Sequence, residues 1–379
     1  MASMTAPRRL LQAGATFVAL AACARAAPLA QELSTQNGPV RVVTVARGLD
    51  HPWGLAFLPD GRMLVTERSG QLRIVERDGR ISEPLAGVPD VAARGQGGLL
   101  DVALDPDFGR NRLIYLSYAE PAGMSAGTAA ARARLGNGRL EDLRVIFRQE
   151  PKVGGGGHFG SRFVFTRDGY LFVTLGERMR RDDSQDLSRH MGKVIRIRPD
   201  GSVPQDNPFV GRGNARPEIW SYGHRNVQGA TLHPGTGELW TVEHGAQGGD
   251  EVNTPKPGRN YGWPVITYGV DYSGARIGEG TSKPGMEQPV FHWDPSIAPS
   301  GMMFYTGDRF PRWRGNLFVG SLKFGVLVRL EENGGRLTGE ERLQIGDRVR
   351  DVRQGPDGYI YLLTDEGNGR ILRLEPGGR

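Results

Sequence analysis

The chain has 379 residues, of which 38% are hydrophobic and 24% are charged, and its formal net charge is +6. This composition is typical of a globular protein with a sizeable core, and it excludes a disordered or collagen-like chain. The basic residues are interspersed with acids and form no basic run, which argues against a nucleic-acid-binding protein.

Residues 1–30 are predicted to be an export signal. Arg8 and Arg9 precede an apolar stretch that ends at Cys23 and is too short to span a membrane. The paired arginines loosely resemble a twin-arginine signal, and LAAC, ending at Cys23, resembles a bacterial lipobox. Ala24-Arg25-Ala26 offers a competing cleavage site. We therefore expect a periplasmic protein that is either simply secreted or anchored by a lipid on Cys23.

Glycine is unusually frequent, with 56 residues, about twice the usual share. The glycines gather with Asp, Asn and Pro in short turns, and six of these turns are followed by strands rich in β-branched and aromatic residues. The strands read RMLVTER, NRLIYLSY, YLFVTLGER, ELWTVEHG, NLFVGSL and YIYLLTDE. Their spacing of about 45 to 75 residues is that of propeller blades with loop insertions.

Six such units predict an all-β fold, a single six-bladed β-propeller with four-stranded antiparallel blades over residues 38–379. Residues 40–46 (VRVVTVA) are predicted to form a strand that completes the last blade beside residues 370–374. This pairing would close the ring and remove exposed sheet edges. A large β-sandwich is the alternative, but it does not explain the recurring unit.

Polar residues stand in glycine-rich segments between these strands, where propeller loops usually place ligands at one end of the central channel. The segments are RGQGGLLDVA with Gln96, GGGGHFGSR with His158, YGHRNVQG with Arg225 and Asn226, VEHGAQGGDEVN, GSLKFG with Lys323, and DRVRDVRQGPDG with Arg348 and Arg350. In this order they resemble the glucose/sorbosone dehydrogenase family of soluble quinoproteins, from about residue 48 to the C-terminus. The length and loops are similar to the compact aldose dehydrogenase branch.

The resemblance implies a six-bladed propeller that holds pyrroloquinoline quinone (PQQ) and Ca²⁺. It implies oxidation of aldose sugars to lactones by hydride transfer to PQQ, with electrons passing on to an external acceptor. Because the chain lacks long insertions, we expect a monomer.

PQQ carries three carboxylates, which arginine side chains can bind through two hydrogen bonds each and which a lysine can neutralise as a point charge. Lys323, Arg348 and Arg350 match the family's cofactor-binding cations, and the two arginines share one face of a strand. Without the resemblance, alternating arginines on a strand indicate a solvated face.

Arg225 and Asn226 match the pair that contacts the quinone oxygens, where they would stabilise a developing oxyanion. Gln96 matches a residue that contacts cofactor and substrate. Tyr272, in VDYSG, is expected to lie beside the cofactor ring. Without the resemblance, Gln96 and Asn226 would be interpreted as turn residues.

Calcium binding is also implied by the resemblance. Ca²⁺ takes oxygen ligands, including backbone carbonyls. In the family, the cofactor calcium is held largely by backbone carbonyls of the loop that matches Gly245 and Ala246. In the compact branch, a further calcium lies near the positions that match Glu251 and Tyr261. The longer branch has Pro in place of Ala246, so the carbonyl is kept while loop rigidity is in question. Without the resemblance, Asp250 and Glu251 indicate an ordinary exposed acidic pair.

His158 matches the family's general base, which takes the anomeric proton while hydride leaves the sugar. A neutral imidazole suits this role because its pKa lies near working pH. In the longer branch an Asp directly precedes this histidine, whereas Gly157 does so here. The group that orients the imidazole must therefore come from elsewhere, or the backbone alone holds it.

The sequence leaves two alternative functions open. A calcium-dependent propeller lactonase or hydrolase needs carboxylates and Asn side chains converging on metal and water, and has no need for Lys323, Arg348 and Arg350. A non-catalytic propeller that binds a partner or polysaccharide would not require His158, Gln96 and Arg225 together.

Overall fold

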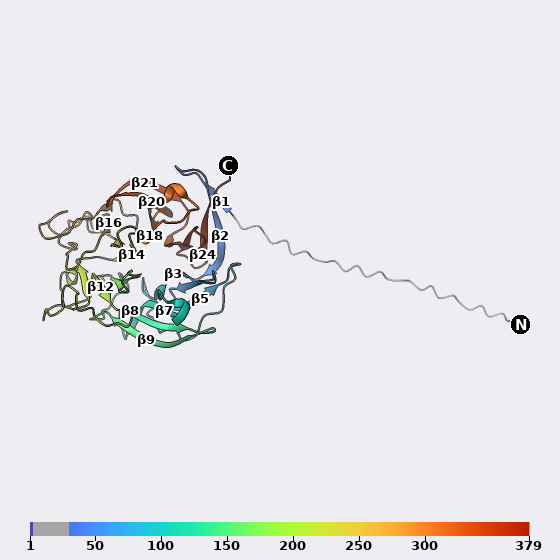
Figure 1. Ribbon diagram of the computed structural model, residues 1–379, viewed down its shortest axis with the longest axis horizontal. Helices are drawn as coiled ribbons and strands as arrows, with labels where there is room; N and C mark the ends of the chain where they lie inside the picture. Colours follow the sequence, from blue (N-terminus) through green and yellow to red (C-terminus); the bar gives the residue numbers. More distant parts are fainter. Residues whose placement is uncertain (3–29, 379) are drawn as a thin grey trace.

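The computed structural model describes residues 1–2 and 30–378, which form six antiparallel sheets arranged in a ring (Figure 1). This confirms the prediction of an all-β, six-bladed propeller. The predicted export signal, with Cys23, falls almost wholly in residues 3–29, outside the described residues.

The blades follow one another along the chain. The first holds β3 (Pro52–Phe57), β4 (Met63–Glu67) and β5 (Gln71–Val75), and the second holds β6 (Leu99–Leu104), β7 (Leu113–Ala122), β8 (Ser125–Leu135) and β9 (Leu140–Arg148). The third holds β10 (Gly160–Phe165), β11 (Leu171–Leu175), β12 (Lys193–Ile197) and β13 (Ile219–Tyr222), and the fourth holds β14 (Val227–Leu232), β15 (Leu239–Glu243), β16 (Asp250–Asn253) and β17 (Phe291–Trp293).

The last two blades complete the ring. The fifth holds β18 (Pro299–Phe304), β19 (Leu317–Ser321), β20 (Val326–Asn333) and β21 (Arg336–Gln344), and the sixth holds β22 (Val349–Gln354), β23 (Ile360–Thr364), β24 (Gly369–Pro376), β2 (Val40–Leu49) and β1 (Ala30–Leu33). The short helices are α1 (Phe108–Asn111), η1 (Arg181–Ser184) and η2 (Pro311–Trp313). Within the described residues, no helix has the length and apolar character needed to cross a membrane.

Ring closure occurs where the sequence predicts it. β2 pairs with β24 from Val40 opposite Pro376 to Leu49 opposite Gly369, so the N-terminal strand completes the last blade. Four blades have four strands, as expected, whereas the first has three and the sixth has five. In the first blade the fourth strand is reduced to a bridge between Ile81 and Val75, and in the sixth β1 pairs outside β2.

The recurring strands of the sequence become the second strand of each blade. Every residue of β4, β11, β15, β19 and β23 is buried. Such strands have no solvated face, because apolar clusters fill the interfaces between adjacent blades all the way around the ring. The core is therefore a set of inter-blade layers, which only a closed ring can bury completely.

Hydroxyl groups on second strands bind the blades together. Ser117 Oγ donates to the carbonyl of Ser161 at 2.7 Å, from the second blade to the first strand of the third. Thr174 Oγ1 donates to the carbonyl of Val227 at 3.1 Å, from the third blade to the fourth. Thr66 makes the same bond from the first blade to the second, so the Thr and Ser of the repeat satisfy backbone carbonyls at the centre of the ring.

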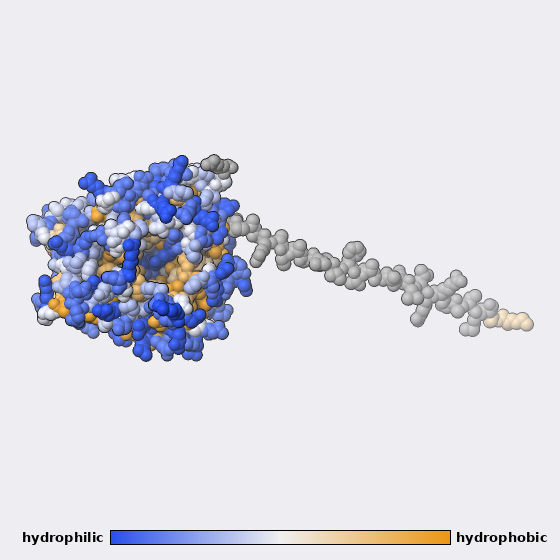
Figure 2. Space-filling model, viewed as in Figure 1, coloured by the Kyte–Doolittle hydropathy of each residue, from blue (hydrophilic) through white to orange (hydrophobic). Residues whose placement is uncertain are grey.

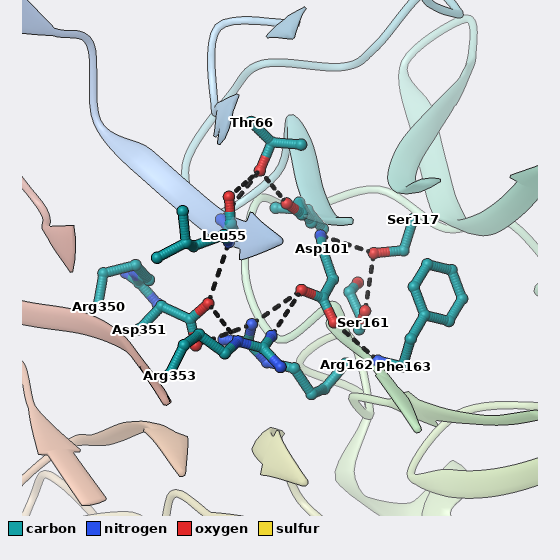
Figure 3. Close-up of polar contacts among 12 residues, drawn as sticks. Leu55, Thr66, Asp101, Ser117, Ser161, Arg162, Phe163, Arg350, Asp351 and Arg353 are labelled. Atoms are coloured by element: carbon teal, nitrogen blue, oxygen red, sulfur yellow. Dashed lines mark hydrogen bonds and ion pairs between the residues drawn. The ribbon is translucent and has the colours of Figure 1, made fainter. Parts of the chain in front are cut away.

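A buried ion network joins the first strands across the axis of the ring (Figure 3). Arg162 Nη1, on β10, lies 2.9 Å from Asp101 Oδ1 on β6 and 3.2 Å from Asp351 Oδ1 on β22. Arg353 lies 2.9 Å from Asp351 and 3.1 Å from Asp101. The side chains of Arg162 and both acids are each 1% exposed, so these charges are compensated almost entirely by one another.

We predict that Arg162→Met strongly destabilises the fold. The change leaves Asp101 and Asp351 short of a cation, and breaking a buried ion pair from one side typically costs about 3–5 kcal/mol. Urea unfolding measures the loss. The matched control is Arg62→Met, since Arg62 makes an exposed ion pair with Asp60 at 2.8 Å that is worth at most about 1 kcal/mol. Equal losses in the two variants would contradict a central role for the network.

Candidate active site

A cavity of about 680 Å³ lies where loops from all six blades converge. Figure 2 shows one face of the ring, hollowed at its centre. The wall includes these residues of the sequence prediction: Gln96, Asn226, Gly245, Ala246, Tyr272, Lys323, Arg348 and Arg350. His158 and Arg225 lie next to wall residues in the chain, whereas Glu251 and Tyr261 stand apart from the cavity. Tyr272 is 71% exposed, which places it at the mouth.

His158 is buried beside a carboxylate that the sequence analysis did not find. Its Nδ1 lies 2.9 Å from Glu177 Oε1, and the two side chains are 7% and 3% exposed. The contact is an ion pair rather than a regular hydrogen bond, since Nδ1 has no hydrogen-bond partner in the described residues. The backbone N–H of His158 donates to Gln96 Oε1 at 2.8 Å, so two predicted site residues are in direct contact. Glu177 is therefore placed to orient the imidazole, although the residue that directly precedes His158 in the sequence is Gly157 rather than an acid.

The backbone around His158 is tightly constrained. His158 has a φ of 53°, a left-handed conformation that costs a non-glycine residue about 1–2 kcal/mol. A Cβ on Gly176, the residue before Glu177, would lie 2.2 Å from the carbonyl oxygen of His158. Gly176 therefore lets the end of β11 approach His158 closely enough for Glu177 to reach the imidazole.

A buried arginine holds the glycine stretch before His158. Arg178 Nη2 donates to the carbonyl of Gly155 at 2.9 Å, Nη1 donates to the carbonyl of Gly157, and the guanidinium lies 3.6 Å above the ring of Phe159. Burial lowers the pKa of Arg178 to about 10, so the group remains charged at neutral pH. The four glycines are thus fixed by a charged donor rather than by side chains of their own.

Arg225 and Asn226 are adjacent in the chain, but only Asn226 lines the cavity. Asn226 lines the cavity, and its Oδ1 accepts from the backbone N–H of Gly160 at 3.1 Å. Its Nδ2 has no hydrogen-bond partner within residues 30–378. Arg225 is absent from the wall, and its Nη1 donates to the carbonyl of Gly245, while its buried Nε has no hydrogen-bond partner in the described part of the chain. Both residues therefore retain unused donors beside the cavity.

Three cations gather on the side of the cavity formed by the fifth and sixth blades. Arg350 Nη2 lies 2.6 Å from Asp365 Oδ2, and Arg348 Nη2 lies 3.4 Å from the same atom. Burial opposes ionisation of Asp365, but Arg350 outweighs it and lowers the pKa of Asp365 to about 2. Lys323 has no carboxylate within 4 Å in residues 30–378, and Arg350 Nε is buried without a partner. Arg350 is 7% exposed whereas the Arg348 side chain is 53% exposed, so only Arg350 departs from the solvated face that the bare pattern allowed.

The proposed cofactor-calcium residues, Gly245 and Ala246, lie in the cavity wall. The carbonyl of Gly245 accepts from Arg225, and its N–H donates to Asp250 Oδ1 at 2.9 Å. No group of three or more His, Cys, Asp or Glu side chains in the described chain is arranged to hold a metal ion. A calcium at this loop therefore stays a prediction that rests on backbone carbonyls.

No hydrogen bond joins Glu251 to Tyr261 in the described part of the chain. Tyr261 Oη donates to the carbonyl of Thr254 at 2.6 Å and accepts from the backbone of Lys256 at 2.9 Å. Burial and the nearby charge of Glu243 raise the pKa of Glu251 to about 8. Asn253 Nδ2 donates to both carboxylates at 3.1 Å, so the protein itself bridges this acidic pair, and the assignment of Glu251 and Tyr261 to calcium remains a prediction.

A sequence signal for the missed residues is visible in retrospect. In four blades, an acid at the end of the second strand or within two residues after it is followed by another polar residue: Glu67-Arg68, Glu177-Arg178, Glu243-His244 and Asp365-Glu366. Of these, Arg68, His244 and Asp365 line the cavity, and Glu177 contacts His158. The one or two residues that follow the repeated strand thus lie in the cavity wall or beside His158, although the sequence alone does not distinguish which of these pairs are functional.

The fold and the site together define a six-bladed propeller whose channel mouth combines a cationic cavity with a buried histidine–carboxylate pair. Residues 49–373 match the family model described as Glucose / Sorbosone dehydrogenase. The chain therefore belongs to the glucose/sorbosone dehydrogenase family, which confirms the resemblance seen in its motifs.

Individual relatives agree with this assignment. The aldose sugar dehydrogenase YliI of Escherichia coli (strain K12) is 49% identical over 356 residues, which cover 92% of this chain and 96% of that protein. A crystal structure of a glucose dehydrogenase is 51% identical with a TM-score of 0.87, covering 89% of this chain and 99% of the other. The PQQ-bound form of an aldose sugar dehydrogenase from Streptomyces coelicolor is 31% identical with a TM-score of 0.75, covering 92% and 99%.

We predict that Asp365→Asn changes the acid stability of the protein. The pKa of Asp365 is about 2 in the folded chain against an ordinary value of 3.8, so its ionised form stabilises the fold by about 2 kcal/mol above pH 4. This contribution disappears as the pH falls through the folded pKa. Urea unfolding between pH 5 and about pH 2.5 should therefore show a steeper loss of stability in the wild type than in the variant. Parallel curves would contradict the assigned ion pairing.

Proposed function

We propose that this chain is an exported, PQQ- and Ca²⁺-dependent aldose dehydrogenase that oxidises sugars at the anomeric carbon to lactones. The observation that carries the proposal is the combination of the cavity cations Lys323, Arg348 and Arg350 with the buried pair His158 and Glu177, which adjoins the wall at Phe159. Membership of the glucose/sorbosone dehydrogenase family supports it, as does the PQQ-bound relative from Streptomyces coelicolor.

The cavity suits the cofactor. Its volume of about 680 Å³ is within the usual range for small-molecule sites. Lys323, Arg348 and Arg350 would hold the PQQ carboxylates, and the unpartnered Arg350 Nε shows unused capacity on this side. Asn226 Nδ2 would donate to a quinone oxygen, with Arg225 beside it, while Gln96 and Tyr272 would flank the ring. When bound, PQQ supplies an ortho-quinone that accepts a hydride.

The protein's part in the reaction is proton transfer and positioning. His158, unprotonated at Nε2, would take the proton of the anomeric hydroxyl as hydride leaves the carbon. Glu177, 2.9 Å from Nδ1, would hold the imidazole in orientation and stabilise its cationic form. Arg178 fixes the carbonyls of the preceding loop, so the base need not reorganise during the reaction.

The metal, the location and the partners complete the proposal. The carbonyls of Gly245 and Ala246 would hold the cofactor calcium, and Glu251 and Tyr261 would lie near a further one. We propose a periplasmic location from the predicted signal, either free or lipid-anchored, a monomeric state, and an external electron acceptor such as a quinone, cytochrome or dye.

The alternatives fit the cavity less well. A calcium-dependent lactonase would need carboxylates converging on the metal, whereas the side of the cavity formed by Lys323, Arg348 and Arg350 is cationic. A simple binding module gives no reason to bury His158 against Glu177 in a left-handed backbone conformation.

The proposal predicts activity that depends on the cofactor. Mature protein prepared without cofactor should bind PQQ, and in the presence of Ca²⁺ it should reduce an artificial electron-acceptor dye with at least one member of an aldose panel. Omitting PQQ should abolish the reduction. A protein that binds no PQQ and oxidises no sugar would overturn the proposed function.

We further predict separate effects for the base and its partner. His158→Ala should lower kcat at least about 100-fold while PQQ binding is retained, because only proton transfer is lost. Glu177→Gln should lower kcat with little change in KM and alter the pH profile, and Glu177→Asp should restore part of the rate. Steady-state kinetics over a range of pH measure both. Full turnover by His158→Ala would remove His158 as the base.

A further inference from the structure

The cavity wall carries a fourth cation that the sequence analysis did not assign. Arg68 lies in the turn after β4 of the first blade and lines the same cavity as Lys323, Arg348 and Arg350. Arg348 and Arg350 both contact Asp365, whereas the guanidinium of Arg68 has no hydrogen bond or ion pair within residues 30–378. A half-buried arginine without a partner is available to an anionic ligand.

The backbone fixes the position of Arg68. Its N–H donates to the carbonyl of His51 at 3.2 Å, and its carbonyl accepts from Leu99 at 3.3 Å. A Cβ on Gly98 would lie 1.9 Å from the carbonyl oxygen of Arg68 and 2.7 Å from its Cγ. Gly98 therefore leaves space for the Cβ and Cγ atoms of Arg68. Hydrogen bonds to two loops fix the backbone of Arg68, while its guanidinium makes no hydrogen bond within residues 30–378.

The charges around Arg68 place it with the cation cluster. Arg350 and, to a smaller extent, Arg68 both lower the pKa of Asp365, against the effect of burial. Asp50, whose pKa Arg68 also lowers slightly, is already 2.7 Å from His51 Nδ1. Arg68 thus faces the same space as Arg350, from the neighbouring first blade.

We propose that Arg68 binds a carboxylate of the cofactor, as a fourth cation beside Lys323, Arg348 and Arg350. Asp365 offsets one of the four charges, so this side of the wall has one net positive charge for each of the three PQQ carboxylates only when Arg68 is included. Asp294, the other acid of the wall, belongs to the fourth blade, across the ring from the first. The inference rests on the proposed function, since it takes PQQ as the ligand.

The test is PQQ binding to the cofactor-free protein, measured by equilibrium titration. Arg68→Gln should raise the Kd for PQQ about tenfold or more, and Arg68→Lys should raise it less, because a point charge is kept while the fork is lost. Since the guanidinium of Arg68 makes no hydrogen bond or ion pair within residues 30–378, the unfolding midpoint of Arg68→Gln should stay close to that of the wild type. The matched control is Arg47→Gln, which removes an exposed arginine outside the cavity and should leave the Kd unchanged.

A chemical control locates the effect on the carboxylates. The trimethyl ester of PQQ has no carboxylate charge, so the wild type and Arg68→Gln should bind it equally. Unchanged PQQ affinity in Arg68→Gln would overturn the role of Arg68, as would a change confined to the KM for the sugar. If the wild type itself fails to bind PQQ, the proposed function fails first, and the two failures are thereby distinguished.

Discussion

The structure depends on Arg162, which joins Asp101 and Asp351 at the axis of the ring. These residues belong to the first strands of the third, second and sixth blades, so one guanidinium fixes how far apart three blades stand. Both halves of the candidate site are attached directly to this point. His158 lies four residues before Arg162, and Arg350 directly precedes Asp351. A shift at the axis would therefore move the base relative to the cations that would hold the cofactor.

Much of the fold could be predicted because its signal is local. The repeated strands, their Asp-Gly turns and the closing strand at residues 40–46 each follow from short patterns, and the structure places all of them as expected. The number of strands in each blade could not be predicted in the same way. The first blade keeps only a bridge at Ile81, and β1 adds a strand before residue 38, because edge pairing depends on neighbours rather than on local pattern.

The site was predicted only in part, for a related reason. Lys323, Arg348, Arg350, Asn226 and Gln96 line one cavity, as the motifs imply, but Arg225 is absent from the wall and donates to the carbonyl of Gly245. The partner of His158 could not be identified because Glu177 follows a different strand and reaches the imidazole only through the close approach at Gly176. Contacts between loops of successive strands leave no fixed spacing in the sequence. The glycine stretch had the same difficulty, since its rigidity comes from Arg178 rather than from its own residues.

The most direct test of the account is a crystal structure of the protein reconstituted with PQQ and an aldose. The account predicts the cofactor in this cavity, with its carboxylates about 3 Å from Lys323, Arg348 and Arg350 and the anomeric hydroxyl of the sugar within hydrogen-bond distance of His158 Nε2. Cofactor bound elsewhere on the ring, or a sugar whose anomeric carbon faces away from His158, would contradict it.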